Sequence, residues 1–568
     1  MGTSFTAALC AAAWPIDELP PDTLDAVVAR NDRSAWLPLR NRTFRVLWLA
    51  VFASNVGLWM QTVGAQWLLV HRAQAAILVS LVQVADMLPD LLFGLIGGVL
   101  ADIFDRRRLL IGVQLVMAVV CTALTVLTRA GHMPPALLLA FTFVLGSGTV
   151  LTGPAYQSLV PDLVPRPQIP AAASLGSVNI NLARAVGPAI AGVLIALTGV
   201  AGVFALDAAS LLLYAIVVAV RPLPSRSRSG DPEPFLLALH SGARYVRYAP
   251  VVRRMLLRAA LFLIPGSVLW ALLPLIATER LGLGSSGYGL LLGSLGIGAV
   301  AGAFILPSVR ARLAPNTLIA AASCAYSIAL VVAVLTHITA VTVAILLPAG
   351  VAWMGFLSSM NAWLQLFLPT WIRARGISVY LMVMFGSQAL GALLWGAVAA
   401  HAGLLPTFLI AAGLMALGAA TIFFWPLIDT EKMGRDTTVY WPEPQLVAPI
   451  TADDGPVVVE TTYTVTPAHQ PAFLEAMTHV RLSRLRTGAT NWGLFRAGEA
   501  EDVFVELFVV PSWQEHARQH QERQTETDQD YEQQAGELSE TTPRTTHLIS
   551  AEVDRRGEID FEGSYINL

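Results

Sequence analysis

The chain has 568 residues, of which 55% are hydrophobic and 13% are charged. Soluble domains contain about 25% charged residues, so most of the surface of this chain is not built to face water. The net charge of −3 provides no basic surface, which argues against a nucleic-acid partner. The three cysteines do not suggest a disulfide framework.

The first 36 residues lack the basic start and the long apolar core of a signal peptide, so we expect 1–36 to be a flexible cytoplasmic tail. A helix needs about 20 mostly apolar residues to cross a membrane. The sequence predicts twelve such helices, at 45–70, 77–100, 109–128, 135–157, 171–197, 201–220, 256–277, 286–307, 317–336, 341–366, 377–400 and 405–428.

Arginines separate the loops between these helices into two classes. With the N-terminus inside, nineteen arginines fall in the inner segments, whereas the outer loops contain Arg72, Arg129 and Arg280. Basic residues accumulate on the cytoplasmic side of membrane proteins. The separation predicts a multi-pass protein of the cell inner membrane, in contact with the lipid bilayer, with both termini in the cytoplasm.

A polar interruption at 221–255 divides the helices into an N-terminal half, 37–220, and a C-terminal half, 256–428. Within this linker, 235–252 is amphipathic and is expected to lie along the inner leaflet. The halves also resemble each other, because Gln157 and Pro161 recur as Gln365 and Pro369 at an offset of 208 residues. Two related six-helix halves are typical of secondary transporters, whose substrate site lies between them.

The residues after 428 are polar and acidic, and they predict a separate cytoplasmic domain. We expect a linker at 429–455, a domain at 456–552 and a flexible tail at 553–568. The predicted strands and helices follow the order β-α-β-β-α-β, at 456–465, 468–486, 490–495, 503–510, 512–540 and 546–552. This order predicts a small α+β ferredoxin-like fold beside an otherwise all-α membrane protein.

His516 and His520 are one helical turn apart, which is a spacing found in metal sites. Residues 517–519 lack the glutamate of a zinc protease, so we expect both histidines on a solvent-facing helix surface. No glycine-rich phosphate loop or Cys/His ligand set is present in the sequence. We therefore expect no catalytic residue, no cofactor and no metal, and the chain is not predicted to be an enzyme.

The loop after the second helix reads from Gly98 to Arg108 as Gly-Val-Leu-Ala-Asp-Ile-Phe-Asp-Arg-Arg-Arg. It resembles motif A of the major facilitator superfamily, a conformational latch. The resemblance implies that Gly98 allows close helix packing. It also implies that Asp102 caps the eleventh helix and pairs with Arg106, followed by the basic Arg107. Asp105 departs from the motif, which has glycine at that position.

The fifth helix contains Gly187, Pro188 and Gly192. These residues resemble the antiporter motif of the same superfamily, which implies export rather than import. Segments 37–45, 154–161 and 181–188 further resemble the branch of enterobactin exporters, known as transmembrane secretion effectors. This resemblance covers roughly 35–552. It implies a major facilitator fold and the export of siderophores, drugs or other natural products in exchange for protons.

The C-terminal domain resembles dimeric α/β barrel domains, which implies a homodimer formed through this domain. An importer remains an alternative to the exporter. A membrane-anchored monooxygenase is a remote alternative, because twelve helices exceed what an anchor needs. No Walker A motif occurs in the chain, which argues against an ATP-driven pump.

Four ionisable residues fall within predicted membrane helices and are candidates for proton coupling: Asp86, Asp90, Arg184 and Asp207. An ionised group at this depth costs at least about 2.5–3.5 kcal/mol. Asp86 and Asp90 are four residues apart and so share one helix face, which suits a proton carrier. Arg184 could pair with an acid and release it on protonation. The alternative is a static salt bridge that only fixes the packing.

In this superfamily the first, fourth, seventh and tenth helices line the substrate cavity. Their polar and aromatic residues are therefore candidates for contact with a small-molecule substrate: Asn55, Trp59, Gln61, Tyr156, Trp270, Asn361 and Gln365. Apolar walls with a few polar groups suit an amphipathic ligand. Each of these residues taken singly could instead serve packing.

Overall fold

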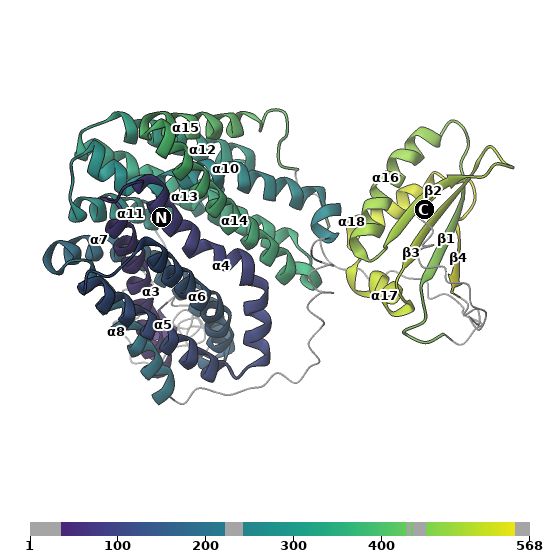
Figure 1. The fold of residues 1–568 in the computed structure, drawn as a ribbon. Coiled ribbons are helices and arrows are strands. Elements are labelled where there is room, and N and C mark those ends of the chain that lie inside the picture. The colour runs from purple at the N-terminus through teal and green to yellow at the C-terminus, as the bar shows by residue number, and fades with distance from the viewer. Residues whose placement is uncertain (1–35, 222–241, 243, 429–432, 435–449, 551–568) are drawn as a thin grey trace, which may run out of the picture.

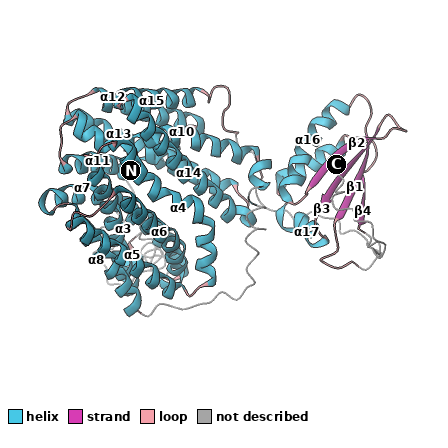
Figure 2. Cartoon of the chain, in the orientation of Figure 1, coloured by secondary structure: helices cyan, strands magenta, loops and turns pink. Residues whose placement is uncertain are grey.

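A computed structural model describes residues 36–221, 242, 244–428, 433–434 and 450–550; the side chains of 95–103 are not described. Figure 1 shows a large helical body joined to a smaller α/β domain. Figure 2 shows that the strands are confined to the smaller domain. The larger part contains the long apolar helices, and the smaller part is a C-terminal domain with one sheet.

The first half contains six long helices: α3 (Arg42–Leu69), α4 (Ala75–Ile103), α5 (Arg106–Arg129), α6 (Pro135–Leu163), α7 (Ile169–Thr198) and α8 (Val200–Val220). Polar side chains cap the N-termini of two of these helices. Asn41 accepts hydrogen bonds from the backbone of Thr43 and Phe44 and so caps α3, and Asp105 accepts one from Arg108 and caps α5. Such caps satisfy backbone N–H groups that have no partner within the helix.

The second half repeats the arrangement with α10 (Pro250–Leu275), α11 (Ser285–Arg310), α12 (Pro315–Leu335), α13 (Thr339–Phe367), α14 (Thr370–Ala402) and α15 (Leu404–Ala420). A short π-helical turn, Ile276–Arg280, continues α10. Eleven helices in the described part of the chain are long and apolar enough to cross a membrane, and α15 is a shorter apolar helix of 17 residues.

The two halves contact each other along two helix pairs. α4 packs along α14, and α7 packs along α11. Figure 1 shows both pairs at the boundary between the halves. Glycines permit this approach: a β-carbon built on Gly192 would lie 2.6 Å from the carbonyl oxygen of Ser285, and one built on Gly289 would lie 2.6 Å from that of Pro188.

The C-terminal domain contains four strands, β1 (Val457–Thr464), β2 (Asn491–Arg496), β3 (Val503–Val510) and β4 (Arg544–Ile549). They form one sheet in the order β2-β3-β1-β4, and every neighbouring pair is antiparallel. Helix α16 (Gln470–Thr487) lies between β1 and β2 in the chain. The single helix predicted at 512–540 is divided into α17 (Trp513–Arg518), a π-helical turn (Gln519–Arg523) and α18 (Glu526–Glu537).

Burial alternates along the central strands, as expected for a sheet with one covered face. On the covered face, Tyr463 and Phe504 pack with Phe473 of α16. Phe508 belongs to a second cluster, which includes Leu485 of the same helix. A buried ionic network crosses the same space. Arg484 donates to Glu506 at 3.3 Å and to Glu532 at 2.7 Å.

The prediction that His516 and His520 face solvent is wrong. Their exposed fractions are 0% and 8%, because the helix turns them toward the sheet. The His516 ring packs near Phe508, and its Nε2 lies 3.0 Å from Nε2 of His547 on β4. The described residues contain no group of three His, Cys, Asp or Glu side chains placed to hold a metal ion.

These buried histidines predict an acid-labile domain. Burial, assisted by the charges of His547 and Arg484, lowers the pKa of His516 to about 3. The unfolded chain then binds more protons than the folded one below pH 6.5. Stability is therefore complete above pH 6.5 and is lost as the pH falls toward 3, by about 2 kcal/mol at pH 5 for His516 alone.

Limited proteolysis of the full chain tests this expectation. Cleavage within 457–549 should increase steeply between pH 7 and pH 5. The variant His516→Phe keeps a ring against Phe508 but cannot take up a proton, so it should show a weaker pH dependence. Equal pH dependence of the variant and the wild type would contradict this account of His516.

The C-terminal domain rests on the ends of α10 and α14. The ring of Tyr245, just before α10, lies 5.8 Å from the ring of Trp371 on α14. Arg486 lies over Tyr245 and Arg523 over Trp371, at 5.8 and 5.2 Å. The predicted amphipathic stretch 235–252 lies only partly within the described residues, and its segment 244–248 is helical and takes part in this contact through Tyr245.

Candidate functional site

A cavity of about 620 Å³ lies inside the first half of the helical body. Its wall is formed by α3, α5, α6, α7 and α8, and one residue of α13, Gln365, contributes from the second half. The polar groups on the wall are Ser54, Asn55, Gln114, Thr149, Thr152, Tyr156, Gln157, Ser177, Asn179, Asp207, Tyr214 and Gln365. Apolar side chains such as Val51, Leu58, Met117 and Leu211 fill the spaces between them.

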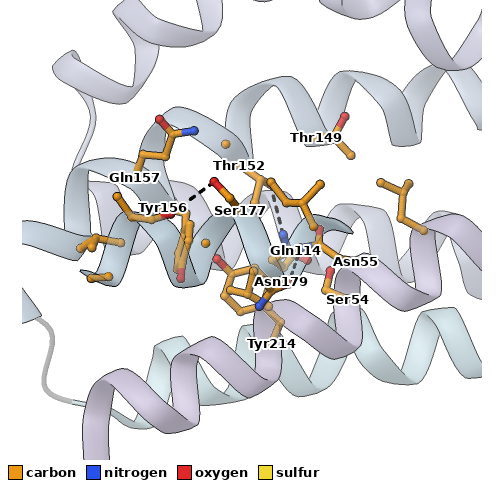
Figure 3. Close-up of a pocket in the computed structure, with 18 of the residues that line it drawn as sticks. Ser54, Asn55, Gln114, Thr149, Thr152, Tyr156, Gln157, Ser177, Asn179 and Tyr214 are labelled. Carbon is orange, nitrogen blue, oxygen red and sulfur yellow. Dashed lines mark hydrogen bonds between the residues drawn. The ribbon is translucent and has the colours of Figure 1, made fainter. Parts of the chain in front are cut away.

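Hydrogen bonds hold several of these amides in place (Figure 3). Asn55 Nδ2 donates to Asn179 Oδ1 at 2.9 Å, and Asn179 Nδ2 donates to the carbonyl oxygen of Trp48 at 2.9 Å. Gln114 Nε2 donates to Thr152 Oγ1 at 3.1 Å. The cavity therefore combines apolar surface with fixed polar groups, which is the character of a site for an amphipathic small molecule.

Asp207 of α8 is the carboxylate on this wall. It is 2% exposed and accepts hydrogen bonds from Cys121 Sγ at 3.1 Å and Ser210 Oγ at 3.4 Å. Its carboxylate packs so closely against Gly57 of α3 that a β-carbon there would collide with Oδ1. Within the described part of the chain, no cation forms a salt bridge with Asp207. The donors to this carboxyl group in the described structure are therefore a thiol and a hydroxyl, both of which are neutral.

The other predicted coupling residues lie elsewhere. Asp86 and Asp90 are on α4 and are not part of the cavity wall. The predicted pairing of Arg184 with an acid is not observed among the described residues. The guanidinium of Arg184 lies instead over the ring of Trp59, 5.3 Å from its centre, and its Nε has no hydrogen-bond partner in the described structure.

An aromatic layer joins the two halves next to Leu58, the last residue of α3 on the cavity wall. The ring of Trp59 on α3 lies 6.0 Å from that of Trp270 on α10, which in turn lies 5.5 Å from that of Trp353 on α13. Two turns further along α3, Gln66 accepts a hydrogen bond from the hydroxyl of Tyr288 on α11. The halves are therefore in contact at this end of the helices, and the cavity lies on the other side of the contact.

The predicted antiporter motif lies beside this closed end. A β-carbon on Gly187 would lie 2.7 Å from Cβ of Trp59, so Gly187 brings α7 against α3. Pro188 and Gly192 bring α7 against α11 through their contacts with Gly289 and Ser285. The motif thus lies where the first half meets the second.

The predicted latch is described only in part. Gly98 and Asp102 belong to the end of α4 whose side chains lie outside the described residues, so the contacts implied for them are not tested. Arg106 donates to the carbonyl oxygen of Ser158 at 3.0 Å and lies 3.6 Å from Asp162.

Arg107 follows Arg106 at the start of α5. It donates to the carbonyl oxygens of Val218, at 3.1 Å, and Ala219 on α8. Both arginines therefore bind helices of their own half in this conformation.

The predicted cavity residues are divided among three environments. Asn55, Tyr156 and Gln365 lie on the cavity wall, and Trp59 and Trp270 belong to the aromatic layer. The other two, Gln61 and Asn361, are not part of the wall. Gln61 is fully buried and donates to Thr142 at 3.4 Å, whereas Asn361 accepts from Gln365 at 3.1 Å.

Sequence reasoning missed several wall residues because it considered only four of the twelve predicted helices. Gln114, Ser177 and Tyr214 come from α5, α7 and α8. The internal repeat contained a usable signal, however. Its two matching glutamines, Gln157 and Gln365, both lie on the cavity wall, one from each half.

Comparison with solved structures agrees with the helical arrangement. A bacterial homologue of the human lysosomal transporter Spinster, in an inward-facing and occupied conformation, has a TM-score of 0.58 at 16% identity. The match covers 68% of this chain and 97% of that one. A D-xylose–proton symporter has a TM-score of 0.53 at 13% identity, with 68% and 98% covered.

Sequence relatives are drug and siderophore transporters. Macrolide efflux protein A of Streptococcus pyogenes is 27% identical over 214 residues, covering 37% of this chain and 53% of that protein, so the match spans about half the length of this relative. The staphyloferrin A transporter of Staphylococcus aureus is 24% identical, with 66% and 94% covered. The multidrug efflux pump Tap of Mycobacterium bovis is 26% identical, with 65% and 90% covered.

The sequence profile of one protein family, described as "Transmembrane secretion effector", matches residues 33–555, which is nearly the whole chain. This extent agrees with the resemblance carried by the loop and helix motifs. The chain therefore belongs to the transmembrane secretion effector family of the major facilitator superfamily.

Proposed function

We propose that this protein is a proton-coupled exporter of small amphipathic molecules across the inner membrane. The observation that carries the proposal is the cavity of about 620 Å³, whose apolar wall holds fixed amides and the buried carboxylate of Asp207. The relatives named for macrolide efflux, staphyloferrin A transport and multidrug efflux support this substrate class. Macrolides, siderophores and hydrophobic drugs are the compounds to test first.

In the proposed cycle, the cavity opens alternately at its cytoplasmic end and at its periplasmic end. We assign both termini to the cytoplasm from the distribution of arginines, and we count α15 as the twelfth membrane helix. In that orientation the contact between Trp59 and Trp270 closes the periplasmic end. Substrate then enters from the cytoplasm and leaves after the halves rock about the α4–α14 and α7–α11 contacts.

Within this cycle Asp207 is the first candidate for the proton carrier, because it lines the cavity and has no cationic partner in the described structure. The carboxylate pair Asp86 and Asp90 is the second candidate. We assign Arg184, stacked on Trp59, to the closed end rather than to an ion pair.

Transport by inverted membrane vesicles tests the proposal. In vesicles energised with an inside-acid gradient, a macrolide, a siderophore or ethidium should accumulate only when the protein is present, and dissipating the gradient should abolish accumulation. Loss of these compounds from the energised vesicles would indicate an importer. Failure of every compound to move would contradict the proposal.

For the C-terminal domain we propose a ferredoxin-like fold that pairs with a second copy through its sheet. The strand order and the antiparallel pairing support the fold. The described helices pack on one face of the sheet (Figure 1), so the other face is left half-buried or exposed. That face includes Val458, Val505, Leu507 and Leu548, and such an apolar surface is typical of an interface.

The substitution Leu507→Arg places a charge at the centre of the proposed dimer contact and should convert a dimer to a monomer. Light scattering of the full chain in detergent measures the mass. Leu474→Arg is the matched control, because Leu474 is 48% exposed on α16, away from the sheet. A monomeric wild type, or equal masses for both variants, would remove the dimer proposal.

A further inference from the structure

A groove of about 570 Å³ runs between α5 and α6 on the face opposite the substrate cavity. Exposed apolar side chains, Phe104, Val116 and Val144, border it, so in a membrane it would face the lipid. Glycines line the bottom of the groove and leave space there because they have no side chain. A β-carbon built on Gly112 would meet no atom within 4 Å, and one built on Gly148 would meet the thioether of Met117.

A positively charged side chain lies at one end of the groove. Arg108 is exposed there, at the start of α5. The neighbouring Asp105 accepts a hydrogen bond from the backbone N–H of Arg108 at 2.8 Å, so its carboxylate is engaged in capping the helix. Arg106 and Arg107 donate to α6 and α8 and so point elsewhere. The guanidinium of Arg108 is therefore placed to meet a negative group at the mouth of the groove.

The length of the groove matches one leaflet of a bilayer. Arg108 and Met117 are nine residues apart on α5, which corresponds to about 14 Å along a helix. The hydrocarbon core of a bilayer is about 30 Å thick, so one leaflet supplies about 15 Å. An acyl chain that starts at Arg108 would therefore end near Met117.

We propose that this groove binds an anionic phospholipid, with the phosphate at Arg108 and one acyl chain over Gly112 and Gly148. Met117 gives the site a consequence for the cavity, because its side chain lines both the groove and the substrate cavity. A bound acyl chain supports the outer side of that wall. The lipid is thus part of the boundary of the substrate cavity.

Native mass spectrometry of the full chain tests the site. The protein is extracted from vesicles that contain equal amounts of phosphatidylglycerol and phosphatidylcholine, and the retained lipids are counted. The wild type should retain phosphatidylglycerol preferentially. Arg108→Gln should lower this preference about fivefold, since one basic residue near an anionic surface contributes about 1 kcal/mol. Gly112→Leu fills open space in the groove and should abolish retention.

Matched variants separate the site from general lipid contact. Arg312→Gln removes an exposed arginine from the corresponding loop of the second half, and Gly413→Leu adds an apolar side chain to an exposed glycine of α15 with open space around it. Both should retain phosphatidylglycerol as the wild type does. Equal retention of the two lipids by the wild type, or unchanged retention in Gly112→Leu, would overturn the proposal.

Discussion

Asp207→Asn is expected to abolish transport driven by a pH gradient while leaving the protein folded in the membrane. The amide has nearly the same shape as the carboxyl group, and its single oxygen can accept from either Cys121 or Ser210, but it cannot exchange a proton. Without an exchangeable proton at this position, substrate movement is no longer linked to the pH gradient, so gradient-driven accumulation should fall to the level of vesicles that lack the protein. Accumulation by inverted vesicles at a fixed pH gradient measures the effect.

Two comparisons make this expectation specific. Cys121→Ala removes a hydrogen-bond donor to Asp207 but keeps the carboxyl group, so it should retain coupling. Asp86→Asn and Asp90→Asn should retain the pH dependence of the wild type if Asp207 is the carrier. If Asp207→Asn keeps that pH dependence and the α4 variants lose it, the carrier is the carboxylate pair.

Gly192→Ala is expected to open the end of the protein that the aromatic layer closes. The added β-carbon would lie 2.6 Å from the carbonyl oxygen of Ser285 and 3.0 Å from Cα of Gly289, both backbone atoms that cannot move aside. α7 and α11 must then separate. Overpacking of this kind costs about 1–3 kcal/mol, enough to shift a two-state equilibrium about 5- to 150-fold and to lower transport accordingly.

Spin labels can follow that opening directly. Cysteines replacing Arg72, between α3 and α4, and His337, between α12 and α13, place one exposed label on each half at the same end of the helices. The distance between the labels should increase in Gly192→Ala. In Gly413→Ala, where a β-carbon meets open space, it should stay as in the wild type. An unchanged distance in Gly192→Ala would contradict the assigned role of the α7–α11 contact.

The membrane helices were predictable because a bilayer imposes a length and an apolar composition on each of them. Their ends were less predictable, since several helices continue beyond the apolar stretch. α6, for example, extends to Leu163, whereas the apolar pattern stops at 157. Asn179 is a polar residue in an otherwise apolar helix, and its amide is satisfied by Trp48 and Asn55 across the interface of α7 with α3.

Side-chain environments were harder to predict than helices. His516 is polar, but the π-helical turn that follows α17 and the facing His547 on β4 make a buried position possible. Arg184 was a candidate to pair with an acid, but its guanidinium stacks on Trp59 instead. The spacing of residues in the sequence does not indicate this contact. The cavity wall also includes residues of α5 and α8. Tertiary packing determines which face of each helix lines the cavity, so the sequence alone did not predict these residues.

Proton movement coupled to substrate movement is the most direct test of the proposed function. Proteoliposomes are loaded with a compound that the inverted vesicles accumulate and with a pH-sensitive dye, and are then diluted into compound-free buffer at equal pH. The exporter mechanism predicts that the lumen acidifies as the compound leaves, and that Asp207→Asn liposomes show no acidification. Loss of the compound from wild-type liposomes without a change in lumen pH, or with alkalinisation, would contradict proton antiport.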